Sequence, residues 1–142
     1  MKLFLIFLML VPFSLFPGKR EDIVSTAKKY IGVRYKSKKY GNYVFDCSGF
    51  VAFVFSKNQI NLPRSSDIQY EKAVKVPADK AKEGDLVFFK IRKKNKVSHV
   101  GIYLGDGTFI HSPSTGKRIC IEKINQTYWK KRFVGFATFI EK

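Results

Sequence analysis

The sequence predicts an α+β fold in which N-terminal helices pack on a C-terminal antiparallel β-sheet. Apolar residues recur at helical spacing before Pro77. After Pro77, compact or alternating apolar runs are separated by glycine-containing turns, a pattern that favours strands. The chain has 142 residues, of which 45% are hydrophobic and 15% aromatic, so it is long and apolar enough for the core of one domain.

The first 18 residues predict a signal peptide or N-terminal anchor, and residues 19–142 predict a single folded domain. An early lysine precedes an apolar run from Leu3 to Phe16, which is short for a membrane span and typical of a signal-peptide core. Phe16 lies where a small residue favours cleavage, so an uncleaved anchor is the alternative. Export argues against nucleic acid as a partner.

The net charge is +16, from 27 Lys and Arg residues against 11 Asp and Glu residues. Such an excess favours an anionic partner, for example an acidic lipid or a negatively charged polymer of the cell envelope. The alternative is a lysine-rich surface that contacts only solvent.

Three helices are expected in the N-terminal half. The first covers residues 20–32 and ends at the glycine. The second begins at Asp46 or Cys47, and Ser65 or Ser66 caps a third, short helix. Apolar residues at helical spacing define one face of the second helix: Cys47, Phe50, Val51, Val54 and Phe55.

Five extended segments follow. "GDLVFF" is a compact apolar run after a Gly-Asp turn, and "VSHVGIYLGDGTFIHS" contains two runs joined by Gly105-Asp106-Gly107, which predicts a hairpin. "RICIEKI" alternates between apolar and polar residues, and "RFVGFATFI" predicts the last strand.

The length of the hairpin loop decides whether the chain's two histidines, His99 and His111, can meet. A two-residue loop leaves them on opposite faces of the sheet. A three-residue loop over 105–107 pairs Leu104 with Thr108 and makes the histidines diagonal neighbours on one face, about 7–8 Å apart between backbones. The two histidines can act together only if the hairpin has the three-residue loop.

The position of Cys47 at the start of a helix suits a nucleophile. Unpaired N–H groups and the helix dipole stabilise a thiolate, so we expect a lowered pKa for this thiol. Small neighbours, Ser48 and Gly49, leave room for a substrate carbonyl, and an N–H group can bind the oxyanion. His99 is the candidate base, and His111 can orient its ring.

Each of these residues also has a structural explanation. A cysteine on an apolar helix face is often a core residue, and a strand histidine is often structural. A zinc site is a weaker alternative, because no CxxC or HExxH spacing occurs. Cys47 and Cys120, the only cysteines, could form a disulfide, which the sequence does not decide.

Several motifs occur together in a specific order: "GVRYKSKKYGNYVFDCSGFV", "LPRSS", "GDLVFF", "SHVGIYLGDGTFIH" and "YWKKRFVGFATFI". With them, residues 20–140 resemble the NlpC-type family of cell-wall cysteine endopeptidases, which have a papain-like fold. The resemblance implies that Cys47 is the nucleophile, that His99 is the base, and that His111 orients His99.

The same resemblance assigns roles to neighbouring residues. Tyr35 matches a tyrosine near the nucleophile that assists the oxyanion or the substrate, with an ordinary loop aromatic as the alternative. Asp46 and Ser48 match positions that contact substrate, with helix capping as the alternative. Arg64 matches an arginine expected to form a structural salt bridge. Cys120 is expected to be a buried strand thiol, since a disulfide to Cys47 would abolish activity.

The resemblance implies an exported hydrolase that cleaves an amide bond in peptidoglycan stem peptides, between D-glutamate and the following diamino acid. We expect a monomer that needs no metal or cofactor. The basic stretch Lys36–Lys39 replaces a usual glycine pair, and we expect it to aid binding to the wall. The alternatives are a lipid-directed thiol acyltransferase on the same fold and a catalytically silent envelope-binding module.

Overall fold

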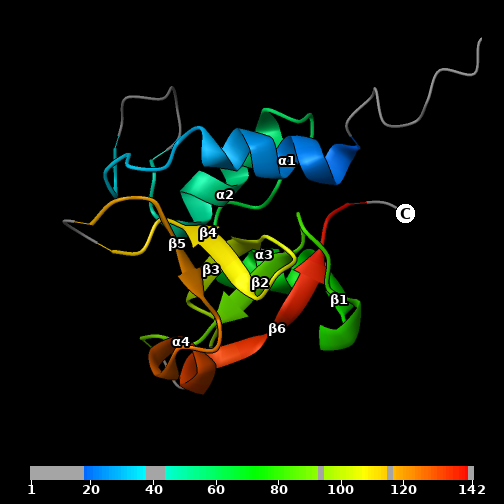
Figure 1. Cartoon of the computed structure of the whole chain (residues 1–142), viewed down its shortest axis with the longest axis vertical. Helices are drawn as coiled ribbons and strands as arrows, with labels where there is room; N and C mark the ends of the chain where they lie inside the picture. Colours follow the sequence, from blue (N-terminus) through cyan, green and yellow to red (C-terminus); the bar gives the residue numbers. More distant parts are fainter. Residues whose placement is uncertain (1–17, 38–43, 93–94, 115–116, 141–142) are drawn as a thin grey trace, which may run out of the picture.

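The computed structural model describes residues 18–37, 44–92, 95–114 and 117–140. Three helices precede all six strands of the sheet, a fourth helix lies before the last strand, and every strand pairing in the sheet is antiparallel. Figure 1 shows α1 and α2 together on one side of the sheet and α4 at its opposite end. The α+β prediction is confirmed, whereas the predicted signal peptide or anchor over residues 1–18 falls almost entirely outside the described residues.

The helices differ from the prediction mainly in where they end. Helix α1 (Lys19–Lys28) ends before Gly32, because Gly32 has a positive φ of 92° and donates its N–H to Ile119 O instead of continuing the helix. Helix α2 (Cys47–Ser56) begins where it was predicted, and α3 (Ser66–Lys72) has Ser65 at its N-cap position. Among the described residues, no helix is long and apolar enough to cross a membrane.

Helix α2 is buried around its whole circumference, so the predicted single apolar face is too narrow. Every residue from Ser48 to Phe55 is buried. The helix packs against α1, α3 and strand β3 (His99–Tyr103) and therefore has no face left for solvent.

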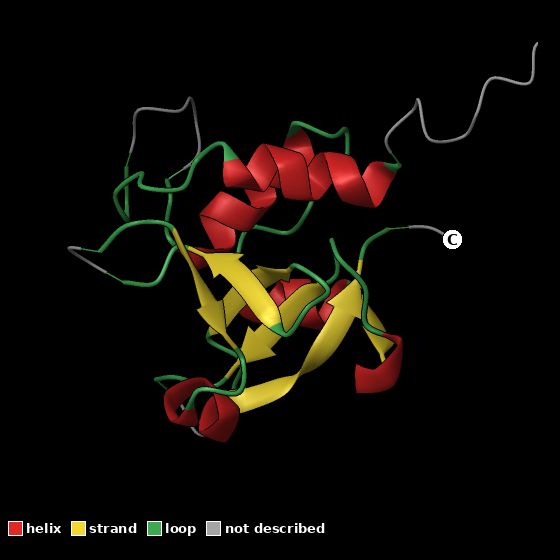
Figure 2. Cartoon of the chain, viewed as in Figure 1, coloured by secondary structure: helices red, strands yellow, loops and turns green. Residues whose placement is uncertain are grey.

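The sheet has the strand order β1-β6-β2-β3-β4-β5 (Figure 2). Its remaining strands are β1 (Val74–Val76), β2 (Leu86–Phe89), β4 (Thr108–His111), β5 (Cys120–Lys123) and β6 (Phe133–Thr138). The sequence did not predict β1, which is too short for an alternating pattern, nor the helix α4 (Thr127–Arg132) and the 3₁₀ turn over Ala78–Lys80.

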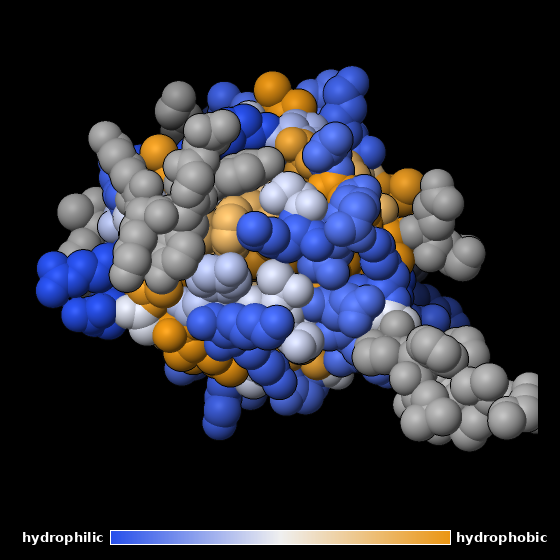
Figure 3. Space-filling view, turned by 90° about the horizontal axis from the view of Figure 1, so that it is seen from above, coloured by the Kyte–Doolittle hydropathy of each residue, from blue (hydrophilic) through white to orange (hydrophobic). Residues whose placement is uncertain are grey.

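Two apolar clusters cover the two faces of the sheet. The larger one joins the helices to one face and includes Phe50, Val54, Val100 and Ile102. The smaller one lies on the other face and consists of Val87, Phe89, Phe109, Trp129 and Phe136. Figure 3 shows a largely hydrophilic outer surface above the helices, with apolar side chains between the polar ones, as a strongly basic chain requires.

Gly49 allows the chain before α2 to fold closely over the helix. A Cβ atom at this position would lie 1.9 Å from Val44 O and 2.8 Å from Asp46 Oδ1. The small size of Gly49 therefore accommodates the preceding backbone, which corrects the expectation that it leaves room for a substrate.

We expect Gly49→Ala to lower the free energy of unfolding by about 1–3 kcal/mol, because the backbone of Val44 must move to admit the methyl group. Urea denaturation measures this change. Gly135→Ala is the matched control, since a Cβ there has no atom within 4 Å. Equal stability of the two variants would contradict the close packing at Gly49.

Candidate active site

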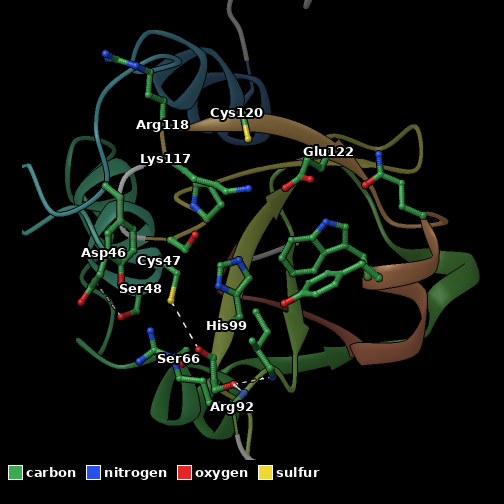
Figure 4. Close-up of a pocket in the computed structure, with 18 of the residues that line it drawn as sticks. Asp46, Cys47, Ser48, Ser66, Arg92, His99, Lys117, Arg118, Cys120 and Glu122 are labelled. Atoms are coloured by element: carbon green, nitrogen blue, oxygen red, sulfur yellow. Dashed lines mark hydrogen bonds between the residues drawn. The ribbon is translucent and has the colours of Figure 1, made fainter.

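A pocket of about 880 Å³ opens where the N-terminal end of α2 meets the start of β3. Cys47 and His99 line it together with residues from β5 and α4. In Figure 4 the Cys47 sulfur and the His99 ring both point into this space, and a ring nitrogen of His99 is turned toward the sulfur. The structure thus brings the predicted nucleophile and base into one pocket.

Asp46 fixes the start of the helix that carries Cys47. Its side chain accepts a hydrogen bond from Gly49 N at 2.8 Å, which makes it the N-cap. Arg64 forms the predicted salt bridge, with Nη2 at 3.0 Å from Asp46 Oδ2, and its Nη1 donates to Ser48 Oγ at 2.8 Å. The capping role expected as the alternative for Asp46 is confirmed, whereas substrate contacts of Asp46 and Ser48 stay a prediction.

The two histidines meet because the hairpin has the three-residue loop. Strands β3 and β4 pair Ile102 with Ile110, and Leu104 N donates to Thr108 O at 2.9 Å. This register places His99 Nε2 2.7 Å from His111 Nδ1. The predicted contact between the histidines is confirmed, and the two-residue loop is excluded.

Glu122 extends the hydrogen bond between the two histidines into a hydrogen-bond chain of three side chains. This residue was not predicted from the sequence. Its Oε2 lies 2.5 Å from His111 Nε2. The hydrogen bond from His111 holds the pKa of Glu122 below its usual range, so Glu122 is a carboxylate that can only accept. The available signal was its place in "RICIEKI", where Glu122 is two residues after Cys120 and therefore shares a face of the strand with it.

The carboxylate determines which nitrogen of each ring carries hydrogen. Since Glu122 accepts, His111 Nε2 must donate and His111 Nδ1 has a lone pair. That lone pair accepts from His99 Nε2, which leaves the Nδ1 lone pair of neutral His99 free on the side of Cys47. The hydrogen-bond chain therefore leaves His99 with a free nitrogen lone pair in the pocket that also holds Cys47, whose Sγ lies 3.9 Å from Ser98 O.

Trp129, from the unpredicted helix α4, packs against the two imidazoles of this hydrogen-bond chain. Its ring stacks on His99, with centroids 5.2 Å apart and planes at 25°, and meets His111 edge-on at 5.0 Å. Its side chain is also among the groups that lower the pKa of Glu122. The indole thus packs against both imidazoles and lies beside the carboxylate.

Burial is the main influence on the pKa values of the Cys47 thiol and the His99 imidazole. It raises the pKa of the Cys47 thiol, and the negative charge of Asp46 raises it further, although N–H groups of Val100 and Ser48 oppose this. Burial and the neighbouring His111 place the pKa of His99 well below the usual value. The expected low pKa of Cys47 is wrong, because desolvation outweighs the helix N-terminus, and a neutral thiol faces a neutral imidazole at rest.

Tyr35 lies in the pocket as predicted. Burial, then Cys47, then Asp46 raise the pKa of its hydroxyl. Its role in oxyanion or substrate binding stays a prediction. Of the basic stretch Lys36–Lys39, residues 38 and 39 lie outside the described part of the chain.

Comparisons with known proteins agree with this geometry. The model of the NlpC/P60 family matches residues 32–138. A gamma-D-glutamyl-L-lysine dipeptidyl-peptidase of Bacillus subtilis is 38% identical over 122 residues, which cover 85% of this chain and 41% of the relative.

The chain belongs to the NlpC/P60 family.

Solved structures carry the same fold. An NlpC/P60 family protein from Bacillus cereus has a TM-score of 0.79 and 31% identity, covering 88% of this chain and 41% of that one. The NlpC/p60 domain of the peptidoglycan hydrolase SagA has a TM-score of 0.70 and 28% identity, covering 84% of this chain and 98% of that domain. The chain thus carries a peptidase domain of this family and spans about two fifths of the first two relatives.

Cys120 departs from the expectation for this NlpC/P60 domain. It is a free thiol, as predicted, but it is partly exposed and lines the pocket rather than lying buried. The reason is that β5 is an edge strand of the sheet, so one of its faces opens into the pocket. Its Sγ lies 4.0 Å from His111 Nε2, farther away than Glu122.

In a Cys120→Ser background, we expect iodoacetamide to alkylate Cys47 with a midpoint above pH 8.5, the ordinary value for cysteine, because burial and Asp46 disfavour the thiolate. Asp46→Asn should move the midpoint to lower pH, since removing a negative charge favours the thiolate. Mass spectrometry across a pH series measures both. A midpoint below that of the denatured chain would show instead that a thiolate–imidazolium pair exists at rest.

Proposed function

We propose that this protein hydrolyses amide bonds in peptidoglycan stem peptides, with the bond between D-glutamate and the following diamino acid as its target. The observation that carries the proposal is the Cys47 thiol at the start of α2, in one pocket with an imidazole oriented by His111 and Glu122. The relatives include a gamma-D-glutamyl-L-lysine dipeptidyl-peptidase and a peptidoglycan hydrolase, which supports this substrate class.

The reaction begins with transfer of the thiol proton to His99 Nδ1 as the sulfur attacks the carbonyl carbon. N–H groups of the first turn of α2 and the Tyr35 hydroxyl are the candidate donors to the oxyanion. His99 then protonates the leaving amine, and water hydrolyses the acyl-enzyme. The imidazolium formed on His99 is stabilised through His111 by the Glu122 carboxylate.

The pocket has the polarity that a peptide with free carboxylates requires. Arg92, Lys117 and Arg118 are among the residues that line it, so it presents several cations to an anionic substrate. An acyltransferase that acts on lipids would need a more apolar cleft. The intact set of Cys47 and two histidines disfavours a silent binding module.

We further propose that the protein acts outside the cytoplasm and that the leader in residues 1–18 directs its export. The substrate lies in the cell envelope, and the first residues have the composition of a signal peptide or anchor. N-terminal sequencing of protein recovered from the envelope fraction tests this proposal and distinguishes a cleaved leader from a retained anchor.

We expect the intact protein to generate new peptide termini from purified peptidoglycan fragments, and Cys47→Ala to generate none, because only Cys47 supplies the nucleophile. Mass spectrometry of the products identifies the cleaved bond. Cys120→Ser is the matched control, since it removes the other cysteine and should retain activity. Cleavage by Cys47→Ala, or a product pattern without new termini, would contradict the proposed reaction.

Replacing Glu122 tests the hydrogen-bond chain. We expect Glu122→Leu to lower kcat by about 10²-fold with a smaller change in KM, because His99 loses its fixed orientation and the imidazolium loses its counter-charge. Glu122→Gln should retain more activity, since an amide oxygen can still accept from His111 Nε2. Nitrogen-15 NMR of the imidazoles reports the tautomers directly. Unchanged kcat in Glu122→Leu would exclude the orienting role.

A further inference from the structure

A second group of side chains lies on the edge strand β5 and its neighbour β4, beside the pocket. His111 pairs directly with Cys120 across the strands, and Glu122 lies two residues further along β5 on the same face. One ligand atom from each of these residues, a nitrogen, a sulfur and a carboxylate oxygen, lies within 4.8 Å of the other two. Figure 4 shows Cys120 and Glu122 on the same strand beside the pocket.

We propose that His111, Cys120 and Glu122 bind a divalent transition-metal ion of the zinc type, and that the bound ion switches the enzyme off. Imidazole nitrogen, thiolate sulfur and carboxylate oxygen are the three ligand types that zinc takes in proteins, at about 2.0–2.3 Å. The mixture of nitrogen and sulfur ligands disfavours magnesium and calcium, which prefer oxygen. Water from the pocket can supply the fourth ligand.

The geometry requires only side-chain adjustment. His111 Nε2 lies 2.5 Å from Glu122 Oε2 and 4.0 Å from Cys120 Sγ. Two ligands of a tetrahedral zinc ion lie about 3.3–3.8 Å apart, as follows from the ligand distances. Glu122 must therefore move away and Cys120 must move closer, and both side chains are partly exposed in the pocket. A thiolate and a carboxylate together neutralise the charge of the ion.

Binding changes the positions of the hydrogens on both imidazoles. A neutral imidazole has one N–H, which His111 carries on Nε2 while it donates to Glu122. A metal ion on Nε2 displaces that hydrogen, so the proton between the rings moves from His99 Nε2 to His111 Nδ1. His99 then takes one proton on Nδ1, the nitrogen that otherwise accepts the proton of Cys47.

The balance of this step is one proton released for each ion bound. His111 loses the hydrogen on Nε2 and His99 gains one on Nδ1, so the two rings together keep their number of hydrogens. Cys120 releases its thiol proton to solvent on becoming a thiolate. The ion therefore inhibits without contact with Cys47, because His99 has no free lone pair for the thiol proton.

Cobalt is the probe for the site itself. In the full-length Cys47→Ala variant, Cys120 is the one remaining cysteine, so a sulfur-to-cobalt charge-transfer band reports Cys120 alone. We expect this band to saturate at one Co²⁺ per chain, and Glu122→Gln in the same background to weaken Co²⁺ binding at least 10-fold. Absence of the band, or equal affinity in the two variants, would overturn the site.

Zinc inhibition tests the switch, which rests on the proposed hydrolase function. We expect Zn²⁺ to inhibit the intact protein at a concentration at least 10-fold lower than Cys120→Ser, with activity restored by a chelator. Equal inhibition of both would place the inhibiting ion at Cys47 and overturn the switch. The cobalt titration needs no activity, so failure of the proposed hydrolase function would not be mistaken for failure of the metal site.

Discussion

The hydrogen-bond chain from Glu122 through His111 to His99 is the constraint on which the site depends. Its two links, 2.5 Å and 2.7 Å long, join three residues from three adjacent strands. A carboxylate at one end can only accept, and this single fact determines the tautomer of both rings. The sheet register, the hairpin loop and the aromatic cover of Trp129 all serve to keep these atoms aligned.

The second constraint is the meeting of α2 with β3. Helix α2 is buried all round, and Gly49 lets the preceding backbone pass close to it, so the position of Cys47 relative to the sheet is fixed by packing. The same burial has an electrostatic consequence. Desolvation outweighs the effect of the helix N-terminus and raises the pKa of the Cys47 thiol.

The pocket combines reactivity with a means of control. His111 contacts both His99 and the second cysteine of the chain, and Glu122 is within reach of His111 and Cys120. The proton positions that permit catalysis and those that permit metal binding exclude one another, because each imidazole carries one hydrogen when neutral. The proposed inhibition thus follows from the same hydrogen-bond chain, Glu122–His111–His99, that supports the proposed catalysis.

The sequence by itself determined the α+β class and the start of α2, because these depend on local periodicity and capping. Motif order made Cys47, His99 and His111 its candidate site residues. It left open the hairpin loop, since both loop lengths suit Gly105-Asp106-Gly107. Only the tertiary structure decided the pairing of His111 with Cys120, the contact with Glu122 and the cover by Trp129. These contacts join segments distant in the chain, and desolvation, which sets the charge of Cys47, exists only once the chain is packed.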